Sequence, residues 1–341
     1  MATEVIAESD LQGHLTVRIP RPLLKLPVRF CGETLAREVN ALPSEAWMGH
    51  PQNYDGNVAI PLVSPGGALV HSSEGPMGPT AWLRRCPYIQ QAMETLDATW
   101  GRSRLMGLEA GANVPEHVDI HYYWRTHLRI HIPVITNPAV TFTCDGETIH
   151  LEAGDCWILD SFYRHSVANR GNQRRIHLVL DTVGSGRIWD LIEAAQDSST
   201  ETKFIEPFDA TARALSFEQI NAPVVMSPWE MRTHVAYIAH WTIEGPRAEE
   251  AFTILDRFLM AWSGTWARYG ISDPGLPIYL KHLEEVRARL ASLGGPEAKM
   301  RNGRRLLASV EELILTNAVA PAIVQRIQQG SSRSSIFRIT A

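Results

Sequence analysis

The sequence predicts a mainly β core, a sandwich or jelly roll, followed by a helical C-terminal portion. Short apolar segments separated by turn residues fill the stretch from 103 to 183. Such runs are typical of antiparallel sandwiches and jelly rolls rather than of βαβ units. After residue 185, apolar residues recur at three- and four-residue steps, which is the helical period. We therefore expect two domains, residues 1–185 with the β core and its N-terminal helices, and residues 186–341 with the helical portion.

The region before the β core is expected to hold fewer regular elements. Pro20, Pro22 and Pro27 predict an irregular leader over residues 1–30, because proline interrupts both helices and sheet ladders. Regular elements are expected at three places: a helix over 32–42, a strand over 54–67 and a helix over 88–100.

Strict alternation marks the central strands of the core. Thr126–Val134 places apolar residues on one face and Arg129 and His131 on the other. The last strand begins at Arg175 and has His177 on the same face. Polar residues therefore share one face of each strand, which is expected to look into the barrel.

A hairpin is expected in the same region. Asp145-Gly146 lies between apolar segments at 140–144 and 148–151. Both central positions of the tightest hairpin turn need positive φ, which Asp and Gly accept readily.

The composition limits the function classes. A net charge of −5 gives no basic footprint for nucleic acid. Neither a signal sequence nor a long apolar run is evident, and the four cysteines are scattered, so we expect reduced thiols in a soluble, cytoplasmic protein with no membrane contact. The C-terminal helices would buttress the core, form a homodimer face, or act as a lid over the substrate.

Two imidazoles and one carboxylate form the strongest candidate site. His117 and Asp119 are two residues apart, so in an extended strand both side chains point to one side. His165 follows a later strand and can complete the set. Two histidines and one carboxylate can hold a non-haem Fe(II) and leave positions open for other ligands.

Arginine residues near this set suggest an anionic co-substrate. Arg175 lies ten residues after His165 and offers the bidentate fork that a carboxylate accepts. Arg129 and His131 are candidates for a second anionic group. His177 shares the face of Arg175, and either touches the bound molecule or fills the barrel interior.

Three segments carry a resemblance to a known family: EHVDIHYYWRTHLRIHIPV, GDCWILDSFYRHSVAN and RRIHLVLD. Together with the upstream DGNVAIPLVSPGG, they resemble the aspartyl/asparaginyl β-hydroxylase and proline hydroxylase family of Fe(II)/2-oxoglutarate dioxygenases. The resemblance covers roughly residues 50–185. It implies a double-stranded β-helix, the cupin-like form of the jelly roll.

The resemblance also implies residue roles. His117, Asp119 and His165 would be the iron ligands, and Arg175 would bind the C5 carboxylate of 2-oxoglutarate. Arg129 and His131 match a motif that helps to bind the co-substrate. The mammalian peptidyl aspartyl hydroxylases have a glycine in place of Asp119, so this chain is more similar to members that act on small substrates.

The function expected from this resemblance is hydroxylation of an unactivated C–H bond in a free amino acid or small amino-acid derivative. O2 is consumed, and 2-oxoglutarate becomes succinate and CO2. One alternative is hydroxylation of Asp or Asn in a peptide or carrier-bound substrate, and others are desaturation or ring formation by the same centre. A different class is a non-catalytic cupin-type protein that binds a metal or ligand.

Overall fold

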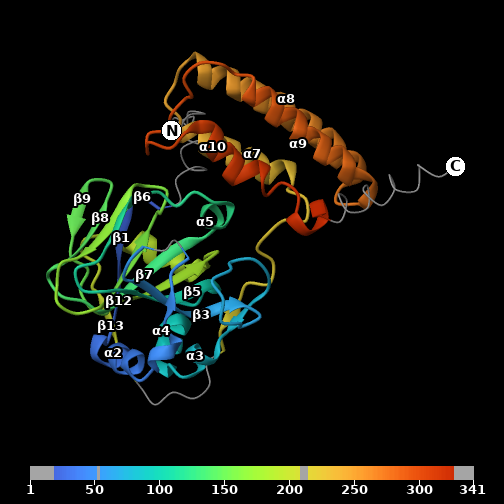
Figure 1. The fold of residues 1–341 in the computed structure, drawn as a ribbon. Helices are drawn as coiled ribbons and strands as arrows, with labels where there is room; N and C mark the ends of the chain where they lie inside the picture. Colours follow the sequence, from blue (N-terminus) through green and yellow to red (C-terminus); the bar gives the residue numbers. More distant parts are fainter. Residues whose placement is uncertain (1–18, 52–53, 208–213, 326–341) are drawn as a thin grey trace, which may run out of the picture. The chain divides into compact units, whose positions relative to one another are not determined.

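The computed structural model describes residues 19–51, 54–207 and 214–325. The chain forms two compact units, a β unit and a helical unit (Figure 1). The β unit comprises residues 19–119 and 123–221, and the helical unit comprises residues 120–122 and the described part of 222–341. The ends of the two predicted domains, residues 1–18 and 326–341, lie outside the described residues.

The predicted domain boundary, between residues 185 and 186, falls inside the β unit. Helix α6 (Gly186–Ala194) contacts strand β1 (Leu23–Phe30), and strand β13 (Lys203–Ile205) pairs with β1 in parallel. The helical period after residue 185 therefore begins before the chain leaves the β unit. Sequence periodicity cannot show which unit a helix packs against.

Two sheets form the β unit. The large sheet has the order β13-β1-β10-β7-β12-β5-β3-β2, with β14 beside β5 and β4 beside β3, and the small sheet has the order β6-β11-β8-β9. The strands of the large sheet not yet given are β2 (Met48–Gly49), β3 (Asn57–Pro65), β4 (Met77–Pro79), β5 (Thr99–Leu108), β7 (Leu128–Ile135), β10 (Asp155–Leu159), β12 (Arg175–Thr182) and β14 (Ser216–Phe217). Those of the small sheet are β6 (Asn113–His117), β8 (Val140–Cys144), β9 (Glu147–Ile149) and β11 (His165–Asn169).

The strand pairing confirms the predicted jelly roll. From β5 onward the chain passes repeatedly between the two sheets, and nearly all strand pairs are antiparallel. The Asp145-Gly146 hairpin also forms as expected, with φ of 50° and 83° at the two positions and Cys144 paired with Glu147.

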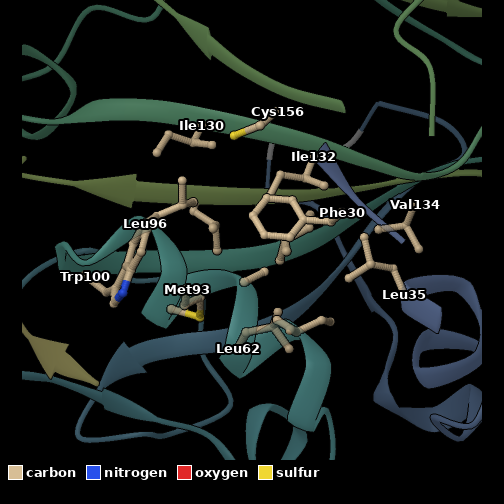
Figure 2. Packing of buried hydrophobic residues seen from close by; sticks show 14 of the residues in the cluster. Phe30, Leu35, Leu62, Met93, Leu96, Trp100, Ile130, Ile132, Val134 and Cys156 are labelled. Carbon is tan, nitrogen blue, oxygen red and sulfur yellow. The ribbon is translucent and has the colours of Figure 1, made fainter. Parts of the chain in front are cut away.

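The outer face of the large sheet is apolar and is covered by helices. In β12, Ile176, Leu178 and Leu180 belong to one buried cluster, which includes residues of α2 (Gly32–Asn40) and α4 (Pro87–Leu96). Figure 2 shows how side chains from these helices meet those of the strands. The labelled residues of this cluster are Phe30, Leu35, Leu62, Met93, Leu96, Trp100, Ile130, Ile132, Val134 and Cys156. Apolar alternation thus fixes which face of each strand looks away from the other sheet.

The expected irregular leader is wrong where the structure describes it. Residues 23–30 form strand β1, which pairs with β10 and β13. Pro27 has no N–H to donate, and it lies between Leu26 and Arg29, where the register with β10 shifts. A shift in register is one of the few places at which a sheet accepts proline. Three prolines close together therefore gave a misleading signal.

The helical unit contains the predicted amphipathic helices. They are α7 (Pro228–Trp241), α8 (Pro246–Tyr269), α9 (Leu276–Ala291) and α10 (Leu306–Val310), which continues into a π-helical turn over Glu311–Leu315. Ser227 caps α7 by accepting a hydrogen bond from the Glu230 N–H. Trp262 of α8 is fully buried and packs against Tyr279 of α9, with ring centroids 4.4 Å apart. Among the described residues, no helix combines the length and the apolar character needed to cross a membrane.

Leu178→Ala tests the predicted role of the apolar face. Leu178 is fully buried in β12, so truncation removes apolar contacts and leaves a cavity. We expect a loss of about 2–5 kcal/mol in the free energy of unfolding, measured by urea denaturation. Leu69→Ala is the control, because Leu69 is 47% exposed, and it should change stability by less than about 0.5 kcal/mol. Equal effects of the two variants would contradict the assignment of this face.

Candidate metal centre and cavity

Pairing of β6 with β11 brings the two predicted histidine ligands together. His117 ends β6 and His165 begins β11, and the two residues are directly opposite in the ladder. Their ring centroids are 4.2 Å apart. Asp119 follows two residues after His117, and its Oδ1 is 3.7 Å from His117 Nε2. One ligand atom from each of the three residues lies within 4.8 Å of the others.

Backbone carbonyls fix the tautomer of both imidazoles. His117 Nδ1 lies 2.8 Å from the Pro115 carbonyl, and His165 Nδ1 lies 2.9 Å from the Tyr163 carbonyl. A carbonyl can only accept, so each Nδ1 carries a proton, and Nε2 is the nitrogen left to bind a metal. This is the arrangement of histidines that bind metals through Nε2. Burial lowers the pKa of His165 to about 4, which keeps its ring neutral near pH 7.

A buried guanidinium group holds the carboxylate of Asp119. Arg129 Nη1 donates to Asp119 Oδ2 at 2.5 Å, and Arg129 Nε donates to Asp181 Oδ1 at 2.9 Å. Burial by itself raises the pKa of Asp119, but the positive charge of Arg129 is the main cause that lowers it, so the net pKa lies below its ordinary value. The group is therefore a carboxylate, as metal binding requires.

Strand register explains the second ion pair. Asp181 of β12 lies directly opposite Arg129 of β7. Burial by itself raises the pKa of Asp181. The positive charges of Arg129 and then Arg102 outweigh this effect and lower the pKa to about 2. Asp181 is only 1% exposed, so this pair is a buried one. Removing one member would leave an uncompensated charge.

A cavity of about 160 Å³ lies beside the three metal-binding candidates. A single water needs only about 10–15 Å³ on this measure, so the space suits a small organic molecule. Its wall includes His117, Asp119, His165, Arg129, His131 and Arg175, together with apolar residues such as Leu108, Phe142 and Leu159. The last three belong to an apolar cluster to which both sheets contribute.

Arg175 is buried at this cavity and is held by its neighbour on β12. Arg175 Nη2 donates to His177 Nδ1 at 2.6 Å, whereas Arg175 Nε has no hydrogen-bond partner among the described residues. Burial lowers the pKa of Arg175 to about 9. Burial and the Arg175 charge also lower the pKa of His177, so its neutral ring can accept this hydrogen bond. His177 is not part of the cavity wall as His131 is.

His131 has unused polar atoms. In the described part of the chain, neither of its ring nitrogens has a hydrogen-bond partner, although the residue is buried and lines the cavity. Burial, then Arg129 and Arg175, lower its pKa well below the ordinary value. A buried polar group without a partner is rare, and it is explained most simply by a ligand that the residue is built to meet.

Sequence reasoning missed two arginines of the wall. Arg102 and Arg104 lie two residues apart on β5, on the face that also carries Met106 and Leu108, and all four line the cavity. The signal was present, because charged residues at alternate positions of an otherwise buried strand indicate a polar interior. Nor was it foreseen that Asp181, which follows Arg175 and His177 on β12, pairs with Arg129.

Comparison with known proteins gives one family match. Residues 77–184 match the family described as aspartyl/asparaginyl beta-hydroxylase. An L-proline cis-4-hydroxylase from Rhizobium meliloti (strain 1021) is 24% identical over 141 residues, which is 41% of this chain and 50% of that protein. The chain thus matches about half the length of this curated relative.

Two solved structures have weaker similarity. A Pseudomonas putida prolyl-4-hydroxylase is 12% identical with a TM-score of 0.34, and the match covers 49% of this chain and 95% of that one. A non-heme monooxygenase, the ThoJ–Ni complex, is 16% identical with a TM-score of 0.30, over 47% of this chain and 72% of that one.

Asp181→Asn tests the buried ion pair through its pH dependence. The folded pKa of Asp181 is about 2, below the ordinary value of about 3.9. Its contribution to stability is therefore fully present above about pH 4 and is lost as the pH falls towards 2. We expect the variant to be at least about 2 kcal/mol less stable at pH 7, and the difference from wild type to shrink at pH 3.

Urea unfolding at both pH values measures this effect, with Asp190→Asn on the exposed face of α6 as the control. The control should match wild type at pH 7. A difference for Asp181→Asn that stays constant from pH 7 to pH 3 would show that its charge is not the cause.

Proposed function

We propose that the protein is an Fe(II)- and 2-oxoglutarate-dependent dioxygenase, a proposal supported by the match of residues 77–184 to the aspartyl/asparaginyl β-hydroxylase family. Its reaction would hydroxylate an unactivated C–H bond of a free amino acid or small amino-acid derivative. The observation that carries the proposal is the convergence of His117, Asp119 and His165 within 4.8 Å, beside a cavity that also contains buried Arg175.

The donor set fits iron. Two imidazoles that can bind through Nε2 and one carboxylate are the ligands of non-haem Fe(II) oxygenases, which leave further positions for substrate and oxygen. A structural zinc site would instead use four protein ligands, commonly with cysteine. His117, Asp119 and His165 would hold the iron through the Nε2 atoms and a carboxylate oxygen. Arg129 fixes the carboxylate by its hydrogen bond to Asp119.

The polar groups at Arg175 fit a 2-oxo dicarboxylic acid. The guanidinium group is buried, is 5% exposed and keeps Nε available, so it can bind a distal carboxylate as a charge-assisted pair. His177 accepts from Arg175 Nη2 and so positions it, while His131 offers a further polar contact. The pKa of each imidazole lies well below the ordinary value, so both rings stay neutral and Arg175 is the cation that would bind the carboxylate.

Fe(II) with 2-oxoglutarate and O2 supplies the oxidation chemistry, and the products are the hydroxylated substrate, succinate and CO2. The chain itself contributes position and environment. Arg129 keeps Asp119 ionised and oriented, Arg175 orients the co-substrate, and the apolar cluster of Leu108, Phe142 and Leu159 limits water at the site. A cytoplasmic location forms part of the proposal and is supported by four free cysteines.

A small substrate is favoured over a peptide by the size of the cavity, about 160 Å³. The name of the Rhizobium meliloti relative, L-proline cis-4-hydroxylase, also indicates a free amino acid as substrate for that protein. Hydroxylation of Asp or Asn in a peptide or carrier-bound substrate is the alternative. A screen of free amino acids, N-acylated amino acids and short Asp or Asn peptides, followed by succinate release, separates the two.

Replacement of His165 by Ala tests the metal site. It removes one of three ligands, so we expect succinate release to fall by at least about 100-fold, more than removal of a group that only orients a ligand. The weak visible band that forms on anaerobic addition of Fe(II) and 2-oxoglutarate should disappear with it. His150→Ala is the control, because His150 contacts the Val140 carbonyl and is not part of the metal-binding group. A wild-type protein without the visible band would favour a non-catalytic cupin-type binding protein.

Changing Arg175 to Gln tests the co-substrate site. Loss of hydrogen bonds to a charged group is worth about 1.5–3 kcal/mol, so the KM for 2-oxoglutarate should rise by about 10- to 100-fold. Arg174→Gln is a matched control, because Arg174 is the preceding residue but pairs with Glu109 and stacks on Trp47. An unchanged KM in Arg175→Gln would place the distal carboxylate elsewhere.

A further inference from the structure

Two further arginines, Arg102 and Arg104, line the cavity from β5 rather than from β12. On β12, Arg175 and Asp181 are six residues apart, which corresponds to about 20 Å along a strand. Val179 lies opposite Arg104 on the neighbouring strand β5, so Arg104 and Arg102 lie towards the Asp181 end. Among the described residues, neither arginine of β5 has a carboxylate at hydrogen-bonding distance, since Asp181 is 3.7 Å from Arg102 and no ion pair involves Arg104.

Arg102 is held firmly but incompletely satisfied. Its backbone N–H donates to Tyr123 Oη at 2.7 Å, and its guanidinium group lies 5.5 Å and 5.2 Å from the ring centroids of Tyr123 and Trp124. Nη1 donates to the His71 carbonyl at 3.2 Å. Asp181 Oδ2 is 3.7 Å from Nη2, too far for a good hydrogen bond. Nε has no hydrogen-bond partner among the described residues, although Arg102 is only 5% exposed.

A buried pair supports the ring beneath Arg102. Tyr123 stacks on His127 with ring centroids 3.8 Å apart, and His127 Nε2 lies 3.0 Å from Glu218 Oε1. Both His127 and Glu218 are buried. This network fixes the orientation of Arg102 before any ligand arrives, which reduces the entropy lost on binding.

Arg104 lacks a carboxylate partner. It is 5% exposed, and its Nη1 lies 3.4 Å from His50 Nε2, a neutral acceptor because burial and then Arg104 lower the pKa of His50 to about 3. No salt bridge to Arg104 forms within the described ranges. Burial, then Arg102 and Arg129, lower the pKa of Arg104 well below its ordinary value. The cation is thus destabilised until an anion enters.

The charge balance points the same way. Four arginines line the cavity: Arg102, Arg104, Arg129 and Arg175. Asp119 and Asp181 are the carboxylates that pair with Arg129. Among these six described residues, two positive charges remain in excess. A divalent metal and a dianionic 2-oxo acid would cancel one another, so the excess persists when both are bound. Buried unpaired charges are strongly unfavourable, and a zwitterionic amino acid would relieve none of the excess in net terms.

We propose that Arg102 and Arg104 form an anion subsite that selects a substrate with net negative charge over a zwitterion. The substrate class is an acidic amino acid, or an amino acid whose amino group is acylated. That the bound anion is a substrate rests on the proposed function, but the preference for binding an anion needs neither iron nor turnover. Each guanidinium group can bind a carboxylate as a bidentate pair.

Isothermal titration of the full-length protein without added metal tests the subsite. The probes are L-glutamate, N-acetyl-L-glutamine and L-glutamine, which are similar in size, and the first two carry one more negative charge than the third. We expect the two anions to bind at least 10-fold more tightly than L-glutamine, in wild type and equally in Arg175→Gln. The tighter of the two anions then identifies whether the charge comes from an acidic side chain or from acylation.

Substitutions assign the preference to β5. Arg104→Gln and Arg102→Gln should each reduce it to less than about 3-fold, and Arg104→Lys should restore part of it by keeping the charge. Arg37→Gln removes a charge from the exposed face of α2 and should leave the preference unchanged. Near-ultraviolet circular dichroism checks that each variant folds. If one Gln variant fails to fold, the other Gln variant and the wild-type affinities for the three probes still test the proposal.

Equal affinity for L-glutamate and L-glutamine in wild type would overturn the proposal. So would a preference that is lost in Arg175→Gln but kept in both β5 variants, because the anion would then bind at Arg175. Failure of the proposed function has a different readout, namely no visible band with Fe(II) and 2-oxoglutarate and no succinate. A charge preference in a protein that shows neither would retain the subsite and reject the oxygenase.

Discussion

The rest of the site depends on the ion pairs that the guanidinium group of Arg129 forms with two carboxylates. This group donates to Asp119, which follows the small-sheet strand β6, and to Asp181, which lies on the large sheet. A single buried cation thereby links the candidate metal centre to the sheet on which the rest of the polar cavity is built. Burying these charges is unfavourable in isolation, so the arrangement persists because each charge has a partner at hydrogen-bonding distance. It also keeps Asp119 ionised, as a metal requires.

The two faces of the large sheet have different functions. One face presents Ile176, Leu178 and Leu180 to the helices and supplies apolar burial that stabilises the fold. The other presents Arg175, His177 and Asp181 from the same strand, with costly buried charges. Since successive side chains of a strand point in opposite directions, one strand can perform both tasks without compromise. The stability supplied by the first face allows the second to remain polar and incompletely paired.

Much of the β core was predictable because its strands and turns follow from patterns among residues that are neighbours in sequence. The alternation of residues 126–134, the strand from Arg175 and the Asp145-Gly146 turn depend on neighbours in sequence, and the structure bears them out. Strand β1 was not foreseen, because Pro27 disfavours a strand locally and only pairing with β10 and β13 shows that its position tolerates proline. The C-terminal boundary of the β unit could not be predicted either, because helix α6 shows the helical period whichever unit it packs against.

The sequence by itself determined that Arg129, His131, Arg175 and His177 fall on polar strand faces. It also predicted that His117 and Asp119 share one side of a strand, although β6 ends at His117 and Asp119 follows it. These follow from a two-residue period and need no partner. Only the tertiary structure decided that His165 lies opposite His117, that Arg129 is engaged by two carboxylates, and that Arg102 and Arg104 face the same cavity. Those contacts depend on strand order and register between segments far apart in the chain. Register is set by the packing of the whole core, so no local pattern specifies it.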